Sequence, residues 1–399
     1  WDSITCFNSL ELDRHLSIGD KRNDSLKILN LGGIKYENNQ KGLSFHNFIH
    51  FNFKNSLYLY FYPRLSENGL KSQIDISGFG YQNNWVQLHI GKGRENWGSG
   101  NEIQLAVSNK SNSYNYFKLA SDYGKIRVNY IHGFLESTQI GINRYITARG
   151  IEWTNKGSTL IGLSETIIYS GYNRGVDIGY VNPIASHLEV ELNNRLSVLG
   201  NENANAVWQA HLDYLIRNEI RVSANFLFDE FVFDRSIEFG KEHGYAYSFR
   251  ISYSPQIFLK KFITFSLSSI KIGTPTFRHF NGTNNFVLHS KPLGWENGSD
   301  GEEMNFGINF FNQKNILGSF SFGVYKIGEE SIINRPYDTY EDYLQGSFPS
   351  GIVKKSKYIT LILFLRVKDN IKINYRSHIV FNTIANKESQ TSLGLSIYF

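Results

Sequence analysis

The last nine residues of the chain, TSLGLSIYF (391–399), alternate strictly between large apolar side chains and small or polar ones. Successive side chains of a strand point to opposite faces, so Leu393, Leu395, Ile397 and Phe399 share one face. Alternation of this kind, closing on an aromatic residue, is typical of a transmembrane β-barrel strand with one face in lipid and the other in the lumen. A half-buried strand of a soluble sheet alternates in the same way, so the rest of the chain must decide.

Other segments repeat the pattern and carry charges on the polar face. Aromatic and aliphatic residues occupy every second position in 126–134, 220–229, 245–253 and 371–381, opposite Arg, Lys, Asn and Ser. A soluble sandwich has one dry face and one solvated face, without so extensive an aromatic face. The apolar faces are therefore interpreted as lipid-facing, and the charged faces as lining a wet lumen.

Composition permits a membrane barrel. The 399 residues include 24 Tyr, 30 Phe and 35 Gly but only 7 Pro, and the mean hydropathy is −0.33. That low value fits a barrel, which turns only every second strand residue to lipid. No apolar run approaches the roughly 20 residues of a transmembrane helix. The single Cys6 forms no internal disulfide, and a net charge of +5 without Lys/Arg runs gives no indication of nucleic-acid binding.

Connection lengths are the stronger test, because outer-membrane barrels alternate short periplasmic turns with long extracellular loops. With the C-terminus placed in the periplasm, the expected short connections fall near 53–55, 82–84, 121–124, 155–157, 182–186, 217–218, 255–261, 312–315 and 368–370. The intervening long ones are 93–115, 193–205, 231–243, 273–302 and 326–354. The sequence therefore predicts an all-β, closed antiparallel transmembrane barrel of about 18 strands, roughly 16 to 20, in a bacterial outer membrane.

One domain covering residues 1–399 is the simplest organisation. No linker, repeat or low-complexity tract divides the chain. Residues 1–41 are poorly patterned and are expected to form a periplasmic N-terminal segment, with a weak strand candidate at 27–36.

Catalytic and metal-binding motifs are not found in the sequence. There is no nucleophile elbow, zinc spacing or P-loop, and the acidic stretch 297–303 (NGSDGEE) lacks the full spacing of a calcium loop. His132, His187, His211 and His378 can be placed on inward faces, where a hydrogen-bonding role is expected. We therefore predict no enzyme activity, no cofactor and no metal.

The segment 90–100 (IGKGRENWGSG) is the most informative candidate for ligand binding. Its glycines permit tight turns, while Arg94 and Trp97 can hydrogen-bond to and stack on a sugar ring. The alternative is that the same segment folds into the barrel mouth as a structural plug contact. The sequence leaves both open.

GRENWGSG (93–100) resembles the GRxxWGxG stretch of the capsule assembly Wzi-type family of outer-membrane proteins, and in particular its Bacteroidota branch. Further matching pieces follow in order at 130–136, 144–153, 163–171, 180–183, 226–230 and 291–302. The resemblance implies a barrel of about 18 strands that anchors surface polysaccharide like a lectin, without covalent chemistry. Members of that family carry a periplasmic helical bundle, whereas residues 1–41 show little helical periodicity, so this element looks shortened or absent.

Polar and aromatic residues of the matching stretches form the candidate site, interpreted as a polysaccharide-binding or lumen-plug network: Arg94, Trp97, Arg144, Arg149, Glu152, Glu165, Asp229 and Trp295. Trp97, Trp295, Tyr337, Tyr340 and Tyr343 are candidates for stacking on sugar rings. The expected function is non-enzymatic binding or anchoring of surface polysaccharide, with a passive porin for small solutes and an accessory subunit of a multi-protein envelope assembly as alternatives. The expected partners are surface polysaccharide, outer-membrane lipid including lipopolysaccharide, and other outer-membrane proteins.

Overall fold

Strands make up most of the computed structural model, which describes residues 25–37, 40–53, 56–66, 73–187, 204–230, 242–255, 262–312, 315–339, 346–368, 371–382 and 388–398. The main strands are β1 (Ser25–Glu37), β2 (Gln40–Phe53), β3 (Leu57–Ser66), β4 (Gln73–Gln82), β5 (Val86–Gly93), β6 (Tyr114–Asp122), β7 (Ile126–Ser137), β8 (Ile142–Thr154), β9 (Thr159–Tyr172), β10 (Ala204–Arg217), β11 (Ile220–Glu230), β12 (Gly244–Tyr253), β13 (Phe262–Ile272), β16 (Gly301–Phe311), β17 (Ile316–Ile327), β18 (Lys354–Lys368), β19 (Ile371–Asn382) and β20 (Glu388–Tyr398). A hairpin of β14 (Val287–Leu288) and β15 (Lys291–Pro292), the short helix α2 (Ile178–Val181) and a 3-10 turn (Gly282–Asn284) lie in the connections. In the described ranges, no helix has the length and apolar character needed to cross a membrane.

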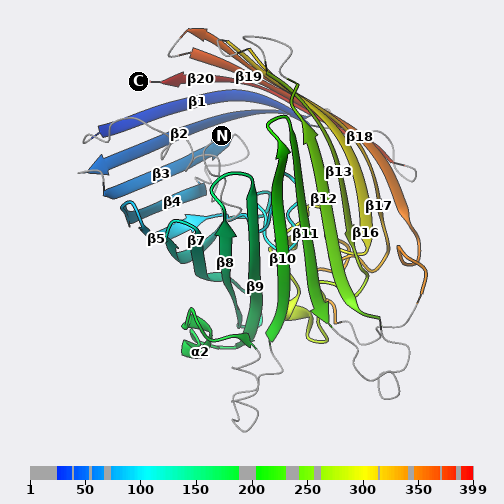
Figure 1. Cartoon of the computed structure of the whole chain (residues 1–399). Coiled ribbons are helices and arrows are strands. Elements are labelled where there is room, and N and C mark those ends of the chain that lie inside the picture. The colour runs from blue at the N-terminus through cyan, green and yellow to red at the C-terminus, as the bar shows by residue number, and fades with distance from the viewer. Residues whose placement is uncertain are drawn as a thin grey trace.

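All main strands belong to one antiparallel sheet of 18 strands, so the prediction of an all-β antiparallel fold is confirmed. Neighbours in sequence pair with each other, and β13 pairs directly with β16 because β14 and β15 form their own hairpin. β1 is hydrogen-bonded to β2 on one side and to β20 on the other, with Gly33 opposite Ser44 and Gly394. The blue and red strands therefore lie side by side in Figure 1, and the pairing joins the first strand to the last.

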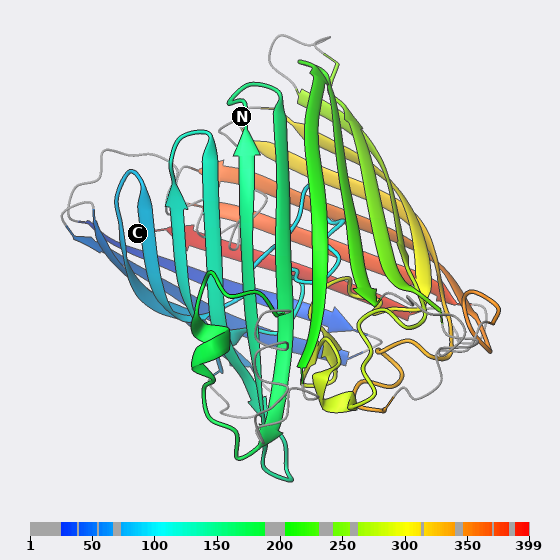
Figure 2. The same cartoon turned by 60° about the horizontal axis from the view of Figure 1, so that its bottom comes forward.

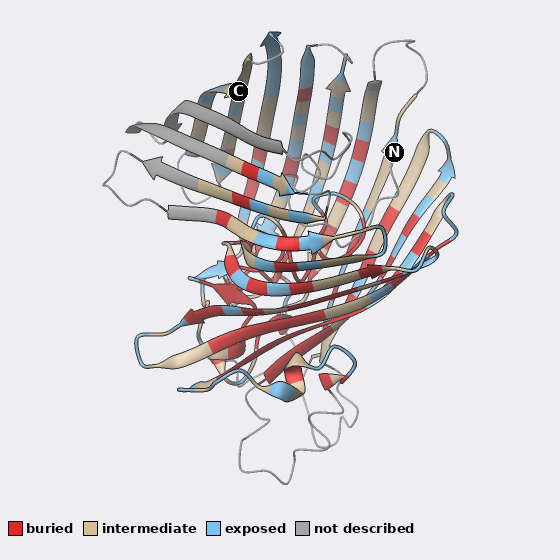
Figure 3. Ribbon diagram, turned by 90° about the vertical axis from the view of Figure 1, so that its left-hand side faces the viewer, coloured by how far each residue is buried: buried red, intermediate tan, exposed pale blue. Residues whose placement is uncertain are grey.

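Side chains alternate between the two faces of this sheet as the sequence predicts. On β12, Tyr245, Tyr247, Phe249 and Tyr253 are 39–43% exposed, whereas Ser248 between them is 2% exposed. Figure 3 shows the resulting alternation of buried and exposed bands along the strands. Leu393 and Leu395 of β20 are likewise exposed, which confirms the outward face predicted for the last strand.

Connections at one end of the sheet are short and several at the other end are long. The short ones include 123–125, 155–158 and 218–219, and the long ones are 94–113, 173–203, 231–243, 273–300 and 328–353. Asn155 stabilises one short turn, since its side-chain oxygen accepts hydrogen bonds from the backbone N–H groups of Gly157, Ser158 and Thr159 at 2.9 Å. The predicted sorting by length is confirmed for these connections.

Two boundary predictions are wrong. Residues 182–186 were expected to form a short periplasmic turn between strands, but they follow α2 within the long connection between β9 and β10. The apolar residues after 172 belong to a folded loop. Their alternation with polar residues is the same as in a strand, which explains the wrong prediction. The N-terminal segment predicted for 1–41 also ends too late, because residues 25–37 are β1 and β2 begins at Gln40. Residues 1–24 lie outside the described part of the chain.

Candidate functional site

Two long loops, 94–113 and 273–300, fold into the interior of the sheet and are here called the plug loops. They hydrogen-bond to each other through their backbones: Ser108 N donates to Leu293 O at 2.8 Å, and Trp295 N donates to Leu105 O at 3.3 Å. In Figures 1 and 2 the first loop, in cyan, lies inside the curve of the strands. The plug loops therefore behave as one packed unit at the long-loop end of the sheet.

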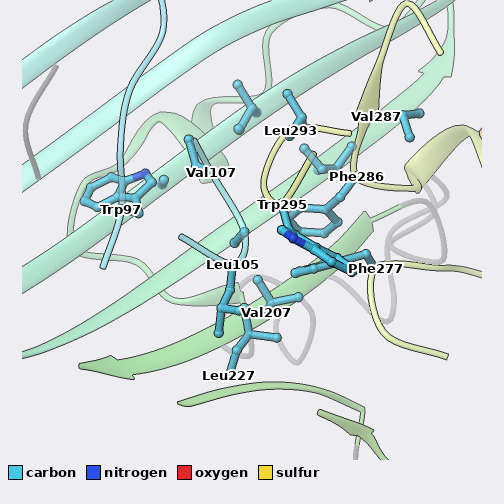
Figure 4. Close-up of a cluster of buried hydrophobic side chains, with 14 of the residues drawn as sticks. Trp97, Leu105, Val107, Val207, Leu227, Phe277, Phe286, Val287, Leu293 and Trp295 are labelled. Carbon is cyan, nitrogen blue, oxygen red and sulfur yellow. The ribbon is translucent and has the colours of Figure 1, made fainter. Parts of the chain in front are cut away.

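A dry apolar cluster fixes the plug to the wall, as Figure 4 shows. Trp97 is 1% exposed, Leu105 0% and Trp295 5%, so neither indole offers a free ring face to a sugar in this arrangement. The wall contributes inward-facing apolar residues from β7 to β13, namely Ile131, Leu135, Ile146, Ala148, Ile168, Val207, Leu227, Ala246, Ile270 and Ile272. The wet lumen predicted behind the charged faces does not extend to this part, because apolar inward residues pack against the plug.

Polar contacts set the position of the first plug loop. The Asn225 side chain on β11 accepts a hydrogen bond from Ser99 N at 2.6 Å and donates to Ser99 O at 3.0 Å. On β12, Ser248 donates its hydroxyl to Ile103 O at 2.6 Å. These bonds satisfy backbone groups that the loop would otherwise bury without partners.

Arg144 on β8 holds the second plug loop. Its fully buried guanidinium donates to the carbonyl oxygens of Thr283 at 2.5 Å, Asn285 at 2.6 Å and Val287 at 2.9 Å. The same group forms an ion pair with Glu136 at the end of β7. A planar guanidinium can donate to several acceptors at once, which explains how one inward residue orders the five loop residues 283–287.

Asp229 and Arg94 lie at the borders of the plug. The Asp229 carboxylate on β11 accepts a hydrogen bond from the backbone N–H of Phe277 in the second plug loop. Arg94 is half-buried directly after β5. Next to it, Glu95 forms a buried ion pair with Lys118 at 3.1 Å and accepts a hydrogen bond from Tyr116 at 2.7 Å. This pair is not among the residues predicted from the sequence, although Tyr116 and Lys118 alternate on the inward face of β6.

Glu152 faces inward as predicted, but away from the other candidates. Its carboxylate lies 3.4 Å from Nε2 of His211, and both side chains are fully buried. His211 reaches this position because Gly162 on the strand between them leaves room: a Cβ there would lie 2.1 Å from His211 Nε2. This pair lies nearer the short-turn end of the sheet than Arg144 does.

Arg149 and Glu165 face outward, which corrects their assignment to a lumen network. Each shares its strand face with exposed apolar residues, Ile151 at 49% and Leu163 at 61%. They are register partners on β8 and β9, and Arg149 Nε lies 3.0 Å from Glu165 Oε2. The prediction relied on charges avoiding the outer face of a barrel. Here the two charges neutralise each other and are covered.

Residues 173–187, which include α2, cover the Arg149–Glu165 ion pair and are here called the outer strap. Tyr130 donates its hydroxyl to Val181 O at 2.7 Å, and Arg149 donates to Asn182 O at 3.0 Å. Glu165 accepts a hydrogen bond from the backbone N–H of His187 at 3.0 Å. In Figures 1 and 2 the green helix α2 lies on the outer side of the wall. The strap's backbone is thus satisfied by outward side chains of the wall.

Stacked rings complete the contact between the strap and the wall. The ring centroids of Tyr145 and Tyr169 are 4.9 Å apart, and those of Tyr169 and Tyr180 are 4.6 Å apart. On the opposite side of the strap, Ile178 and Ile184 are 83% and 89% exposed. The strap therefore turns backbone polar groups and the Tyr180 ring to the protein, and Ile178 and Ile184 away from it. Sequence alternation alone could not reveal this, because a loop that folds back over a strand leaves no periodic signal.

Protonation of His187 is expected to loosen the strap. Burial and, to a smaller extent, the nearby Arg149 guanidinium together lower the pKa of its imidazole to about 4. The unfolded value is about 6.5, so the stabilisation is complete above that pH and is lost as the pH falls towards 4. Tryptic cleavage after Arg174, measured from about pH 7 to about pH 4.5 and divided at each pH by the cleavage rate of an unstructured peptide, should accelerate as the pH falls.

Two variants check this prediction. His187→Gln should weaken the acceleration, because the titrating group is gone, whereas His289→Gln at an exposed position should leave it unchanged. A cleavage rate in the native protein that does not change with pH would contradict the assignment.

The histidines and acidic residues of the described ranges were also compared with the requirements of a metal site. Within the described residues, no group of three or more His, Cys, Asp or Glu side chains could hold a metal ion. His132, predicted to face inward, shares the outward face of Ile126 and contacts the Thr147 hydroxyl at 2.9 Å. Tyr340 and Tyr343 lie outside the described part of the chain.

Comparison with solved structures identifies the fold. Wzi of Escherichia coli, described as an outer-membrane protein involved in group 1 capsule assembly and a carbohydrate-binding β-barrel, superposes with a TM-score of 0.71 at 12% identity, over 97% of this chain and 87% of Wzi. OprD of Pseudomonas aeruginosa gives a TM-score of 0.56 at 10% identity, over 96% of each chain. OccD3 of the same organism gives 0.55 at 10% identity, over 96% of this chain and 92% of OccD3. No protein-family model and no curated protein matches the sequence. At these identities the likeness shows the fold alone, which is that of outer-membrane β-barrel proteins.

Proposed function

We propose that this protein is a closed 18-stranded outer-membrane barrel that binds or anchors surface polysaccharide, without covalent chemistry, and that its C-terminus lies in the periplasm. The observation that carries the proposal is the plug: two loops from separate parts of the chain meet inside the wall in a dry cluster around Trp97 and Trp295. A filled interior suits retention of a ligand at the surface better than passage through the lumen. The likeness to a carbohydrate-binding barrel supports the same function.

The proposed binding surface is the polar mouth above the plug, where the second plug loop meets β7 and residues 328–339 after β17. Glu136 accepts hydrogen bonds from Tyr337 at 2.7 Å and from the backbone of His289 at 3.1 Å. The tip of the β14–β15 hairpin leaves His289, Ser290 and Lys291 exposed. At this surface an acidic sugar can meet exposed hydrogen-bond donors and the ammonium group of Lys291, with the Tyr337 ring beside them.

Lys291→Ala tests this surface. Loss of a charge-assisted hydrogen bond worth about 1.5–3 kcal/mol should weaken binding of an acidic surface polysaccharide by about tenfold or more. Affinity for the polysaccharide of the source organism would be measured by titration of the purified protein. Lys125→Ala, at an exposed position on the short-turn end of the sheet, is the matched control and should bind normally.

Absence of binding, together with unchanged capsule retention in a deletion strain, would overturn the proposal. A passive porin is the competing function, and it predicts large conductance in planar bilayers, whereas the plugged barrel predicts little current. An accessory subunit of an envelope assembly is the other alternative, for which stoichiometric partners should co-purify after mild detergent extraction.

A further inference from the structure

The outer wall between β3 and β8 contains a groove with a volume of ≈680 Å³. Its apolar lining comes from outward-facing residues: Leu59, Phe79, Ile90 and Phe134 are 48%, 58%, 50% and 37% exposed. Val176 of the outer strap forms part of its rim. The groove is therefore on the outside of the barrel, separate from the plug and from the polar mouth, and its size is in the range of about 300–1,000 Å³ of ligand pockets.

Charge in the groove is confined to one end. Lys92 lies one residue before the end of β5, at the long-loop end of the strand, with Asn115 as its register partner on β6. Among the described residues no carboxylate forms an ion pair with Lys92. Leu59, Phe79 and Ile90 form a register row further from the loops, whereas Phe134 lies level with Lys92 across Asn115. The groove therefore has one cation in its loop-side row and an apolar row below it.

We propose that this groove holds the lipid A part of one lipopolysaccharide molecule, with acyl chain against Ile90 and Phe79 and a phosphate on Lys92. The inference rests on the outer-membrane location and orientation given above, which place the long-loop end of β5 at the headgroup level of the outer leaflet. A lysine at that level attracts an anionic headgroup, while its stem and the wall below it meet hydrocarbon.

A peptide is a poorer occupant of the same groove. Extended peptides bind by adding a strand to a free sheet edge. Each of β3 to β8 is already paired on both sides, from the β2–β3 ladder to the β8–β9 ladder. The groove presents apolar side chains and the ammonium group of Lys92. These groups are complementary to the acyl chains and the phosphate of a phosphorylated lipid.

Native mass spectrometry of the full-length protein in detergent tests the assignment, with lipid A, phosphatidylglycerol and phosphatidylcholine added separately. Lipid A should bind most tightly and phosphatidylcholine least. Lys92→Ala should weaken lipid A binding by about tenfold, as expected for one charge-assisted contact, with little effect on phosphatidylcholine. Phe79→Gln should weaken all three by reducing the apolar lining.

Lys357→Ala is the matched control, because Lys357 is an exposed residue near the long-loop end of β18, and its register partners Val324 and Phe381 are exposed apolar residues. It should bind lipid A normally. Equal loss in Lys92→Ala and Lys357→Ala, or equal binding of phosphatidylglycerol and lipid A, would overturn the assignment to this groove or to lipid A. Lys92→Ala should leave polysaccharide binding unchanged, and Lys291→Ala should leave lipid A binding unchanged, so the two proposals fail separately.

Discussion

Gly294→Ala is expected to separate the two plug loops and raise the conductance of the proposed barrel. A Cβ at Gly294 would lie 1.7 Å from the carbonyl oxygen of Leu105 and 2.6 Å from its carbonyl carbon. These are backbone atoms, so no rotamer change relieves the overlap, and the loops must move apart. Overpacking in a tight core typically costs about 1–3 kcal/mol, and here the obstacle is backbone. Single-channel recording in planar bilayers should show larger and noisier currents than those of the native protein.

Gly175→Ala is the control for this experiment. Gly175 lies in the outer strap, and a Cβ there would meet nothing within 4 Å. The variant should conduct like the native protein and unfold at the same temperature. Native-like conductance of Gly294→Ala would show that the contact between residues 105 and 294 does not hold the plug in place.

Arg144→Met is expected to have the second large effect, by releasing the loop 273–300 from the wall. The substitution leaves Glu136 buried without its guanidinium and removes the donor from three loop carbonyl groups. Breaking a buried ion pair by removing one partner costs about 3–5 kcal/mol. The melting temperature in detergent should fall, and proteolysis of the loop should accelerate.

Two further variants separate charge from packing. Arg144→Met combined with Glu136→Gln should recover part of the lost stability, because no uncompensated carboxylate remains. Arg335→Gln removes a guanidinium from a more exposed ion pair with Glu330, in which the arginine side chain is 41% exposed. Exposed pairs contribute about 0–1 kcal/mol, so this control should be nearly neutral. If Arg144→Met were as mild as Arg335→Gln, the role of Arg144 as the loop anchor would be wrong.

Strand positions and facing were predictable because the chain encodes them locally. The aromatic alternation in 245–253 and the tight turns near 155–157 and 217–218 each require only a few neighbouring residues, and the structure confirms them. Arg144 and Trp97 were identified as candidates from local motifs. Their partners were not predictable, since the carbonyl groups that Arg144 binds lie about 140 residues away in sequence.

By itself the sequence determined an antiparallel β-fold with outward aromatic faces and loops sorted by length, since period-two alternation and turn residues are local properties of a strand. Only the tertiary structure decided where the loops go. Residues 94–113 and 273–300 fold inward and bury Trp97 and Trp295, whereas residues 173–187 fold outward over the Arg149–Glu165 pair. Alternation tells which face a side chain occupies, but the cost of a charge on that face depends on what covers it, and the cover comes from a distant part of the chain.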